Sequence, residues 1–291
     1  MTIYNLGSIN ADIVYRVPHL PGAGETLSCA SMTRGLGGKG ANMSVAAARA
    51  AARVVHIGAI GPDGIWAKDR LLEFGVDTQH ISVPDTDATG HAIIYVDDAG
   101  ENSIVIYPGT NRQISTQMIG AALSGADPAD TLLIQNETNA QVEAAKLAAE
   151  RGMKVAYAAA PFDAAAVESV LPFCDFLILN EVEAAQLEHA SGLGPDKLPV
   201  RDVIVTLGSK GCRWHRSDTG ESRAFPAIPV EVVDTTGAGD TFTGYVLAGL
   251  DRGMTMEQAI AQATRAAALQ VTRLGAADVI PDLKDIQGAA F

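Results

Sequence analysis

Short apolar runs alternate along most of the chain with longer segments of helical periodicity. The apolar runs have the length and continuity expected of strands buried on both faces, and they cover residues 3–7, 54–60, 131–135, 154–158, 176–179 and 203–207. The segments between them have the spacing of helices, and they cover residues 40–52, 63–74, 140–151, 164–171 and 181–190. Strands and helices that alternate in this way predict a parallel sheet covered by helices on both faces.

Two regions depart from this alternation. Residues 13–34 contain several prolines and glycines and show no helical period. Residues 92–96 and 103–107 each alternate apolar and polar positions around Asp97-Asp98-Ala99-Gly100, which predicts a β-hairpin. We therefore expect a small β-sheet subdomain inserted into a larger α/β domain. The inserted part would comprise residues 13–34 and 89–108, and the α/β domain residues 1–12, 35–88 and 109–291. A sheet that projects from a domain is suited to act as a lid.

A chemical signal lies near the C-terminal end, where residues 230–233 are predicted to form a strand and residues 238–250 a helix. The turn between them is Thr235-Thr236-Gly237-Ala238-Gly239-Asp240. Its small residues allow a sharp turn that presents backbone N–H groups at a helix N-terminus, where an anion binds well. Asp240 in the first helical turn would then act as a general base beside this anion hole. On spacing alone, a capping role for Asp240 above a tight turn is an open alternative.

The run Gly35-Leu36-Gly37-Gly38-Lys39-Gly40 matches the spacing of a dinucleotide-binding fingerprint. Its context differs, because that fingerprint follows the first strand, and the first strand here ends near Gly7. A phosphate-binding P-loop is excluded as well, since Lys39 is followed by Gly40 instead of Ser or Thr. We expect these glycines to let a polar ligand approach the backbone, with Asn42 nearby as donor and acceptor.

Further polar residues follow predicted strands. Asn10 and Asp12 come shortly after the first strand and alone are typical turn residues. Asn180 and Glu183 begin a helix and share one of its faces, which fits either a helix cap or a magnesium ion held through water. Residues 206–211 end a strand in a turn of small residues, which by itself is a weak signal.

Composition narrows the classes of function. The chain has 291 residues, of which 47% are hydrophobic and 19% charged, so it can form a well-packed core. Its net charge of -13 would repel nucleic acid phosphates, and no apolar run approaches the ~18 residues of a membrane span. The three cysteines show no paired spacing, which argues against a disulfide framework or a zinc site and for a reducing cytoplasm. We expect neither nucleic acid nor membrane as a partner.

Taken together, these runs resemble the ribokinase-like (pfkB) family of carbohydrate kinases, and the resemblance extends in order over nearly the whole chain. The matching motifs lie at residues 7–12, 37–42, 180–183, 206–211 and 234–240. The resemblance implies a three-layer α/β/α fold with a mainly parallel central sheet and a small inserted β-sheet lid. It also implies that the lid pairs two subunits into a homodimer, and that ATP and Mg²⁺ take part in the reaction.

The resemblance implies a role for each matching residue. Asp240 would be the general base, and Gly237, Ala238 and Gly239 the anion hole. The residues implied in sugar binding are Asn10, Asp12, Gly38, Lys39, Asn42, Glu137 and Asp240. Those implied around the nucleotide are Asn180, Thr206, Gly208, Gly211 and Gly239. Glu183 would serve Mg²⁺, and the residues implied around a potassium-type monovalent ion are Asp234, Thr236, Gln270, Arg273 and Gly275.

The chain departs from the family pattern at residues 157–161 and at Val279. Residues 157–161 read Tyr-Ala-Ala-Ala-Pro, where relatives have an Asn-Pro motif or, in kinases of acid sugars, an Asn and an Arg. The missing Arg disfavours an acid-sugar substrate. Val279 stands near the end of the monovalent-ion segment, where a hydroxyl residue is common, so dependence on K⁺ stays open.

The expected function is transfer of the ATP γ-phosphoryl group to a hydroxyl of a small neutral sugar, with ribose as the first candidate. Another acceptor on the same fold is the nearest alternative: a nucleoside, fructose or a sugar phosphate. A sugar-binding regulator that has lost catalysis is a second alternative, and the intact Asp240 motif argues against it. A third, an NAD-dependent enzyme, rests only on the glycine spacing at residues 35–40 and is not expected.

Overall fold

The computed structural model describes residues 1–291, and they contain two β-sheets. The larger sheet has nine strands in the order β13-β12-β11-β10-β9-β8-β1-β4-β5. Its strands are β1 Thr2–Leu6, β4 Arg53–Ala59, β5 Ile81–Ser82, β8 Thr131–Gln135, β9 Lys154–Ala158, β10 Phe176–Asn180, β11 Asp202–Thr206, β12 Cys212–Arg216 and β13 Glu221–Phe225. All neighbouring strands are parallel except the β11–β12 and β12–β13 pairs. The prediction of a mainly parallel central sheet is therefore confirmed.

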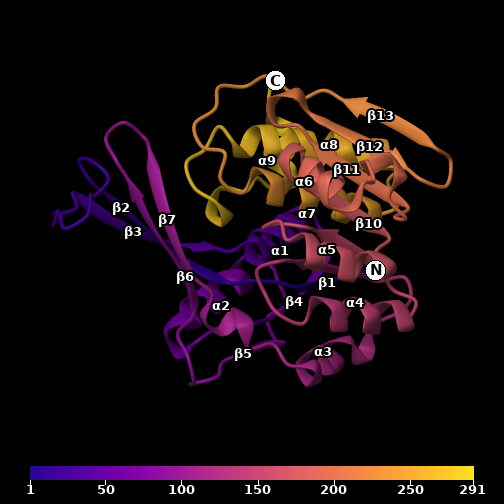
Figure 1. The fold of residues 1–291 in the computed structure, drawn as a ribbon, viewed down its shortest axis with the longest axis horizontal. Coiled ribbons are helices and arrows are strands. Elements are labelled where there is room, and N and C mark those ends of the chain that lie inside the picture. The colour runs from indigo at the N-terminus through magenta and orange to yellow at the C-terminus, as the bar shows by residue number, and fades with distance from the viewer.

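Helices lie on both faces of this sheet (Figure 1). One face is covered by α1 Lys39–Arg49, α2 Ile65–Glu73, α7 Ala238–Asp251, α8 Met256–Gln270 and α9 Leu283–Gly288. The other face is covered by α3 Thr116–Ala122, α4 Gln141–Glu150, α5 Ala164–Val170 and α6 Glu181–Ser191. Short 3-10 turns link them at Pro62–Gly64, Gly109–Arg112, Leu123–Gly125, Leu171–Phe173, Pro195–Lys197, Gly208–Lys210 and Ala277–Val279.

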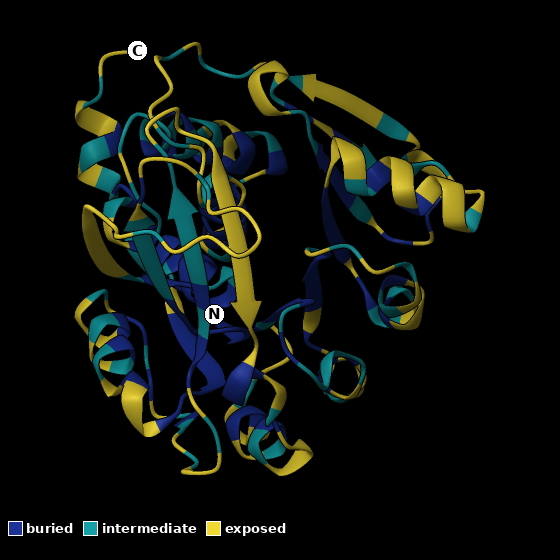
Figure 2. Ribbon diagram, turned by 60° about the vertical axis from the view of Figure 1, so that its left-hand side comes forward, coloured by how far each residue is buried: buried dark blue, intermediate teal, exposed yellow.

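The core is split in two by the sheet, because successive side chains of a strand point to opposite faces. Along β1, Ile3 packs in the cluster that includes α1, α7 and α8, whereas Tyr4 and Leu6 pack in the cluster that includes α3 to α6. Figure 2 shows the strands in the middle of the body as buried and the outer faces of many helices as exposed. This arrangement is the predicted three-layer α/β/α fold.

The smaller sheet projects from the body beside α1 and α2 (Figure 1). It contains β2 Asn10–Arg16, β3 Ser31–Gly37, β6 Gly90–Val96 and β7 Asn102–Tyr107, in the order β3-β2-β6-β7. The predicted hairpin is confirmed as the antiparallel pair β6–β7. Strand β7 is one of the two edge strands of this sheet, and each of its residues is exposed (Figure 2).

Two predictions of local structure are wrong. Residues 230–233 form no strand but follow two prolines into an irregular loop, where the Val233 N–H donates to Val271 O at 2.8 Å. Asn10 and Asp12 lie in strand β2 and not in a turn, because the chain that leaves β1 enters the small sheet directly. The periodicity also failed to reveal the β12–β13 hairpin and helix α8.

No helix of the structure is both long and apolar enough to cross a membrane.

Candidate functional site

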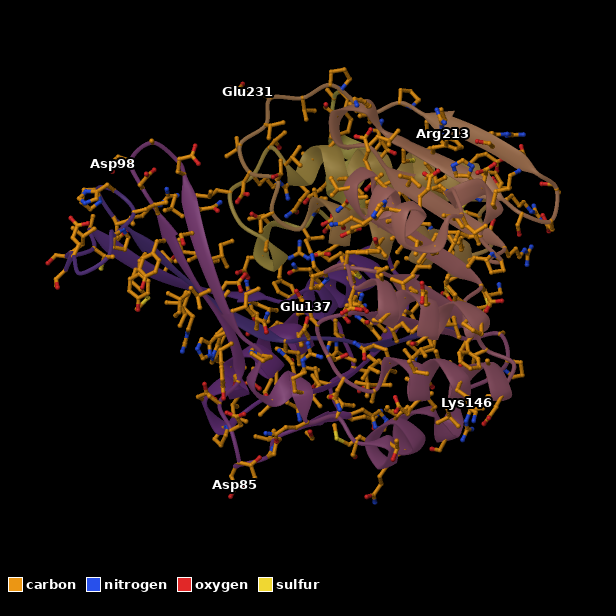
Figure 3. All side chains as sticks on the ribbon, in the orientation of Figure 1. Asp85, Asp98, Glu137, Lys146, Arg213 and Glu231 are labelled. Atoms are coloured by element: carbon orange, nitrogen blue, oxygen red, sulfur yellow. The ribbon has the colours of Figure 1, made fainter.

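The predicted site residues gather where the carboxyl ends of parallel strands meet the small sheet. Strand β1 lies between β4 and β8, so the connections from neighbouring strands diverge at this end of the sheet, which is where α/β proteins bind ligands in a crevice. Glu137 follows β8, Asn180 ends β10 and Thr206 ends β11. Figure 3 places Glu137 in the middle of the molecule, between the small sheet and the body, whereas Asp98 lies at the far tip of the small sheet.

Glu137 is held from two elements. Ser8, just after β1, donates its hydroxyl hydrogen to Glu137 Oε2, and the backbone N–H of Lys39 donates to the same oxygen over 2.9 Å. The other oxygen, Oε1, takes part in no hydrogen bond within the protein. One oxygen therefore fixes the carboxylate and the other is left for a ligand.

Asp240 is almost completely buried, with 7% of its surface exposed. Its Oδ2 accepts a hydrogen bond of 2.8 Å from Asn42 Nδ2 in helix α1, although the two residues lie 198 positions apart in the sequence. Burial raises the pKa of Asp240, and the nearby Glu137 adds to the rise, whereas Lys39 and the Asn42 hydrogen bond oppose it. Asn42 Oδ1 is buried without a partner, so this amide can still accept a hydrogen bond from a ligand.

Asn10 and Asp12 reach the same crevice from strand β2. Asn10 Oδ1 accepts a 2.7 Å hydrogen bond from Asn111 Nδ2, and Asn111 also binds the Ile9 backbone. The side chain of Asp12 lies against Gly37, where an added Cβ would come within 2.0 Å of Asp12 Oδ2. Burial, then the nearby Glu137 and Asp240 carboxylates, raise the pKa of Asp12 to about 7.

Two glycines allow the chain to fold at this point. Gly38 has a φ of 91°, which disfavours any residue with a Cβ, and it sits directly before helix α1. A Cβ on Gly40 would come within 2.4 Å of Gly7 Cα, so Gly40 lets α1 begin against the end of β1. Gly40 therefore allows close contact between two protein backbones. The sequence predicted that it would instead let a ligand approach the backbone.

Lys39 carries the positive charge of this crevice. The pKa of its ammonium is raised chiefly by Asp240 and further by Glu137 and Glu183, although burial opposes the rise. Lys39 is therefore charged while it lies among three carboxylates. Sequence reasoning identified these charged residues but assigned no role to Ser8, although it lies in the motif at residues 7–12, and missed Asn111 entirely. Both roles depend on contacts with residues more than 100 positions away.

The turn before helix α7 leaves backbone donors free. Gly237 has a φ of 73° and stands at the N-terminus of α7, and no side chain caps the helix. The Ala238 N–H donates to Thr235 O at 3.2 Å, while the N–H groups of Gly237 and Gly239 have no backbone acceptor. The capping alternative for Asp240 is therefore wrong, because its carboxylate accepts from Asn42 and not from its own helix. A helix N-terminus of this kind attracts an anion.

Asn180 and Glu183 form a reciprocal cap at the start of α6. The Glu183 N–H donates to Asn180 Oδ1, and the Asn180 N–H donates to Glu183 Oε2, both over 2.8 Å. Burial raises the pKa of Glu183, with Asp240 adding to the rise and Lys39 and the Asn180 hydrogen bond opposing it. Glu183 Oε1 takes part in no hydrogen bond. Because Mg²⁺ is usually held by one or two carboxylates together with substrate phosphates, this oxygen fits such an ion.

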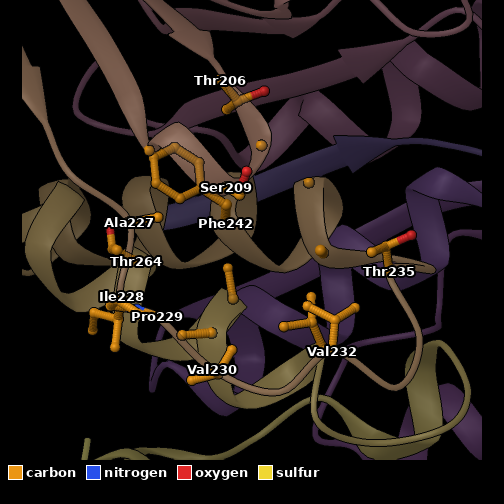
Figure 4. A pocket seen from close by; sticks show the side chains of 17 residues that line it. Thr206, Ser209, Ala227, Ile228, Pro229, Val230, Val232, Thr235, Phe242 and Thr264 are labelled. Carbon is orange, nitrogen blue, oxygen red and sulfur yellow. The ribbon is translucent and has the colours of Figure 1, made fainter.

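A cavity of about 690 Å³ opens beside the start of α7 (Figure 4). Four of the five predicted nucleotide residues line it, namely Thr206, Gly208, Gly211 and Gly239, whereas Asn180 does not. Sequence reasoning missed the apolar side chains of the lining, namely Ala227, Ile228, Pro229, Val230, Val232, Phe242, Ala267, Ala268 and Val271. Figure 4 shows Val230 and Val232 on one loop and Phe242 on α7. Apolar walls with a few polar groups are typical of a site for a small molecule.

The residues predicted around a monovalent ion lie together, but the side-chain oxygens of Asp234 and the carbonyls of Thr236 and Gly275 already have partners. Asp234 Oδ1 accepts from the Thr236 N–H and hydroxyl, and Asp234 Oδ2 accepts from the Gly275 N–H at 3.0 Å. Partial burial acts to raise the pKa of Asp234, but these hydrogen bonds outweigh it and lower the pKa. The Thr236 and Gly275 carbonyls both accept from the Gln270 side chain. Arg273 donates to Val279 O and to Asp285. In this arrangement the residues do not fit a monovalent ion.

Comparisons with known proteins agree with this geometry. The model of the family described as pfkB family carbohydrate kinase matches residues 2–283. A ribokinase of Haemophilus influenzae is 38% identical over 96% of this chain and 95% of its own length. The structure of a ribokinase from Thermotoga maritima has a TM-score of 0.87 at 32% identity and covers 99% of this chain and 98% of that one. A ribokinase of Arabidopsis thaliana, solved with ribose and ATP, has a TM-score of 0.85 at 29% identity over 98% of this chain and 97% of that one.

Proposed function

The chain belongs to the pfkB family of carbohydrate kinases, and we propose that it transfers the γ-phosphoryl group of ATP to a hydroxyl of a small neutral sugar, ribose first. The observation that carries this proposal is the position of Asp240. Its buried carboxylate stands at the start of α7, with Asn42 on one side and Gly239 of the nucleotide cavity on the other. The likeness to a ribokinase solved with ribose and ATP supports the choice of both substrates.

Asp240 acts as the general base. Because burial raises its pKa, the carboxylate is a better proton acceptor than an exposed aspartate. It takes the proton of the sugar hydroxyl while the hydroxyl oxygen attacks the γ-phosphorus, and ADP leaves with the electrons of the broken P–O bond. Asn42 holds the carboxylate in one orientation during this step.

The groups around Asp240 bind the two substrates. The sugar hydroxyls bind to hydrogen-bonding groups of Asn10, Asp12, Gly38, Asn42 and Glu137. The Lys39 ammonium offsets the negative charge that develops nearby. The free N–H groups of Gly237 and Gly239 face the transferred phosphoryl group. When bound, Mg²⁺ supplies further positive charge at the phosphates, and we assign Glu183 to hold it. Thr206, Gly208 and Gly211 line the adenine end, whereas Asn180 orients Glu183.

The small sheet acts as the lid in this proposal. Residues 13–34 and 89–108 contain most of its strands, and Asn10 and Asp12 stand at the base of β2. Movement of the sheet would therefore carry two acceptor-binding residues toward Asp240. Closure of this kind excludes water from the transfer step and so limits hydrolysis of ATP.

A coupled assay of ADP release over a panel of acceptors tests the proposed function. The panel contains ribose, deoxyribose, fructose, a nucleoside and a sugar phosphate, each with ATP and Mg²⁺. We expect ribose to give the highest kcat/KM. Faster turnover of the nucleoside or the sugar phosphate would assign a different acceptor, and sugar binding by calorimetry without ADP release would identify a regulator.

We also propose that the lid pairs two copies of the chain. Strand β7 is an unpaired edge, and it exposes Ile104, Val105, Ile106 and Tyr107 by 44–63%. An exposed apolar edge strand is a template on which another chain can pair. Sedimentation should therefore give a species of twice 30.2 kDa, and Val105→Lys with Ile106→Lys should convert it to a monomer. A wild-type protein that sediments only as a monomer would refute the pairing.

A cytoplasmic location completes the proposal, since this compartment supplies ATP and keeps thiols reduced. All three cysteines are free, and burial raises the pKa of Cys174 and Cys212 to about 12, which keeps both thiols protonated and unreactive. When cells that express this sequence without an added targeting segment are fractionated, the protein should be recovered together with cytoplasmic markers.

A further inference from the structure

Three backbone carbonyls converge on the side chain of Gln270. This residue ends helix α8 and is completely buried. Its Nε2 lies 3.3 Å from Thr236 O, 3.2 Å from Gly275 O and 3.2 Å from Ala276 O. An amide nitrogen has only two hydrogens to donate, so the three oxygens share them. The carbonyls come from two separate loops, one before α7 and one after α8.

Carbonyl oxygens that point at one centre are the usual surroundings of a dehydrated K⁺ ion. Here the centre is occupied by an NH₂ group, whose hydrogens present positive charge to the same oxygens. Two of these carbonyls, those of Thr236 and Gly275, belong to residues that the sequence assigned to an ion.

The Val279 side chain and the Asp234 carboxylate offer no unpartnered oxygen to an ion either. Both side-chain methyls of Val279 lie 3.8 Å from the position of a Cβ on Gly275, so the last residue of the segment presents hydrocarbon there. The Val279 carbonyl accepts a 3.1 Å hydrogen bond from Arg273. Both oxygens of Asp234 accept hydrogen bonds from Thr236 and Gly275.

We propose that the Gln270 side chain takes the place of a monovalent cation, so that this chain works without K⁺. Gln270 is a positioning residue. The Thr236 carbonyl that it binds belongs to the peptide unit that leads into Gly237, and so Gln270 holds the turn whose N–H groups face the phosphoryl group. The effect on turnover rests on the proposed kinase function, whereas the effect of ions on the folded protein does not.

The orientation of the amide decides between two opposite outcomes. Nitrogen and oxygen of a Gln side chain are distinguished by their hydrogen bonds. In the present orientation Nε2 faces the carbonyls and Oε1 is buried without a partner. The reverse orientation would bring Oε1 against three carbonyl oxygens, which only a cation among them could offset. An amide that faces the carbonyls with nitrogen thus predicts no ion dependence, and one that faces them with oxygen predicts activation by K⁺.

The test compares K⁺ with tetramethylammonium, which is too large to enter, at a matched ionic strength of about 0.1 M. The wild-type Tm without substrates and the wild-type kcat should each be the same in both salts, the kcat within about twofold. Gln270→Glu keeps the shape of the side chain but places a carboxylate oxygen among the carbonyls. We expect its Tm and its kcat to fall in tetramethylammonium, the kcat by more than about tenfold, and both to recover as K⁺ is added. Gln270→Ala should show a Tm that rises with K⁺ to saturation.

Gln262→Glu is the matched control, because Gln262 lies about two turns earlier in α8 and contacts none of these carbonyls. Its Tm should not respond to K⁺. The proposal is overturned if the wild-type protein is activated or stabilised by K⁺, or if the two Gln270 variants respond to K⁺ no more than Gln262→Glu does. If no chain forms ADP with any sugar, the proposed function fails, and the Tm measurements still decide the role of Gln270.

Discussion

The crevice around Asp240 and the cavity proposed for the nucleotide adjoin at the start of α7, but the side chains that line them differ in chemistry. The crevice brings Asp12, Glu137 and Asp240 together around Lys39, and burial and mutual charge displace several of their pKa values. The cavity of about 690 Å³ has no ionisable side chain among its lining residues. In the proposed function, the crevice works through charge and proton transfer, which need particular residues. The cavity works through shape, which many small apolar residues can provide.

The largest effect on turnover should come from removing Asp240, the proposed general base. Asp240→Asn keeps the shape and the Asn42 contact but cannot take a proton, so we expect kcat to fall by about 10²–10⁴ with the KM for ATP little changed. Steady-state ADP release measures this. Asp251→Asn at the opposite end of α7 is the control and should keep its kcat. Near-normal turnover by Asp240→Asn would show that another group accepts the proton.

Asp12→Asn should weaken sugar use but stabilise the fold, which separates charge from function in the crevice. We expect a loss of about 10–100-fold in kcat/KM for the sugar, because a charge-assisted hydrogen bond is lost. The pKa of Asp12 is raised from 3.8 to about 7, so the folded protein loses stability as the pH rises between these values. Asn cannot ionise, so the variant should gain roughly 2–4 kcal/mol above pH 7.

This stability gain should shrink as the pH falls and disappear below pH 3.8, where Asp12 is protonated in the folded and unfolded states alike. Urea unfolding at several pH values measures it. Asp98→Asn at the exposed tip of the small sheet is the control, because it makes the same substitution far from the crevice (Figure 3). A variant at position 12 that is less stable than wild type above pH 7 contradicts the crowding of carboxylates inferred here.

The smallest effect should come from the cavity, since shape tolerates change better than charge does. Ala268→Leu adds bulk to the cavity wall, so we expect the KM for ATP to rise about tenfold while the KM for the sugar is unchanged. Thr264→Val is the control in the same wall. The Thr264 hydroxyl already donates to Ile260 O at 2.8 Å, so its loss should change the KM for ATP by no more than about twofold. An unchanged KM in Ala268→Leu would place the nucleotide elsewhere.

The difference between the crevice and the cavity also explains which features could be predicted from the sequence. Strands β8 and β9 match their predicted bounds, and helix α7 begins at the predicted residue, because apolar period and turn chemistry act over a few neighbouring residues. The valine-rich run at residues 230–233 was misassigned for a related reason. Strand propensity is local, but a strand also needs a partner, and this segment has none and instead lines the cavity. The charged residues of the crevice were identifiable by type, whereas the apolar wall of the cavity was not.

The sequence by itself determined the alternation of strands and helices from β8 to β11, the hairpin of the small sheet and the residue types available for proton transfer and anion binding. Only the tertiary structure decided that Asn42 meets Asp240 across 198 positions, that Asp12 shares its charge environment with Glu137, and that Gln270 occupies the centre of three carbonyls. Periodicity and propensity arise within a helical turn or a strand. Burial, pKa shifts and converging hydrogen bonds arise from contacts between segments that are distant in sequence, and these form only when the whole chain has packed.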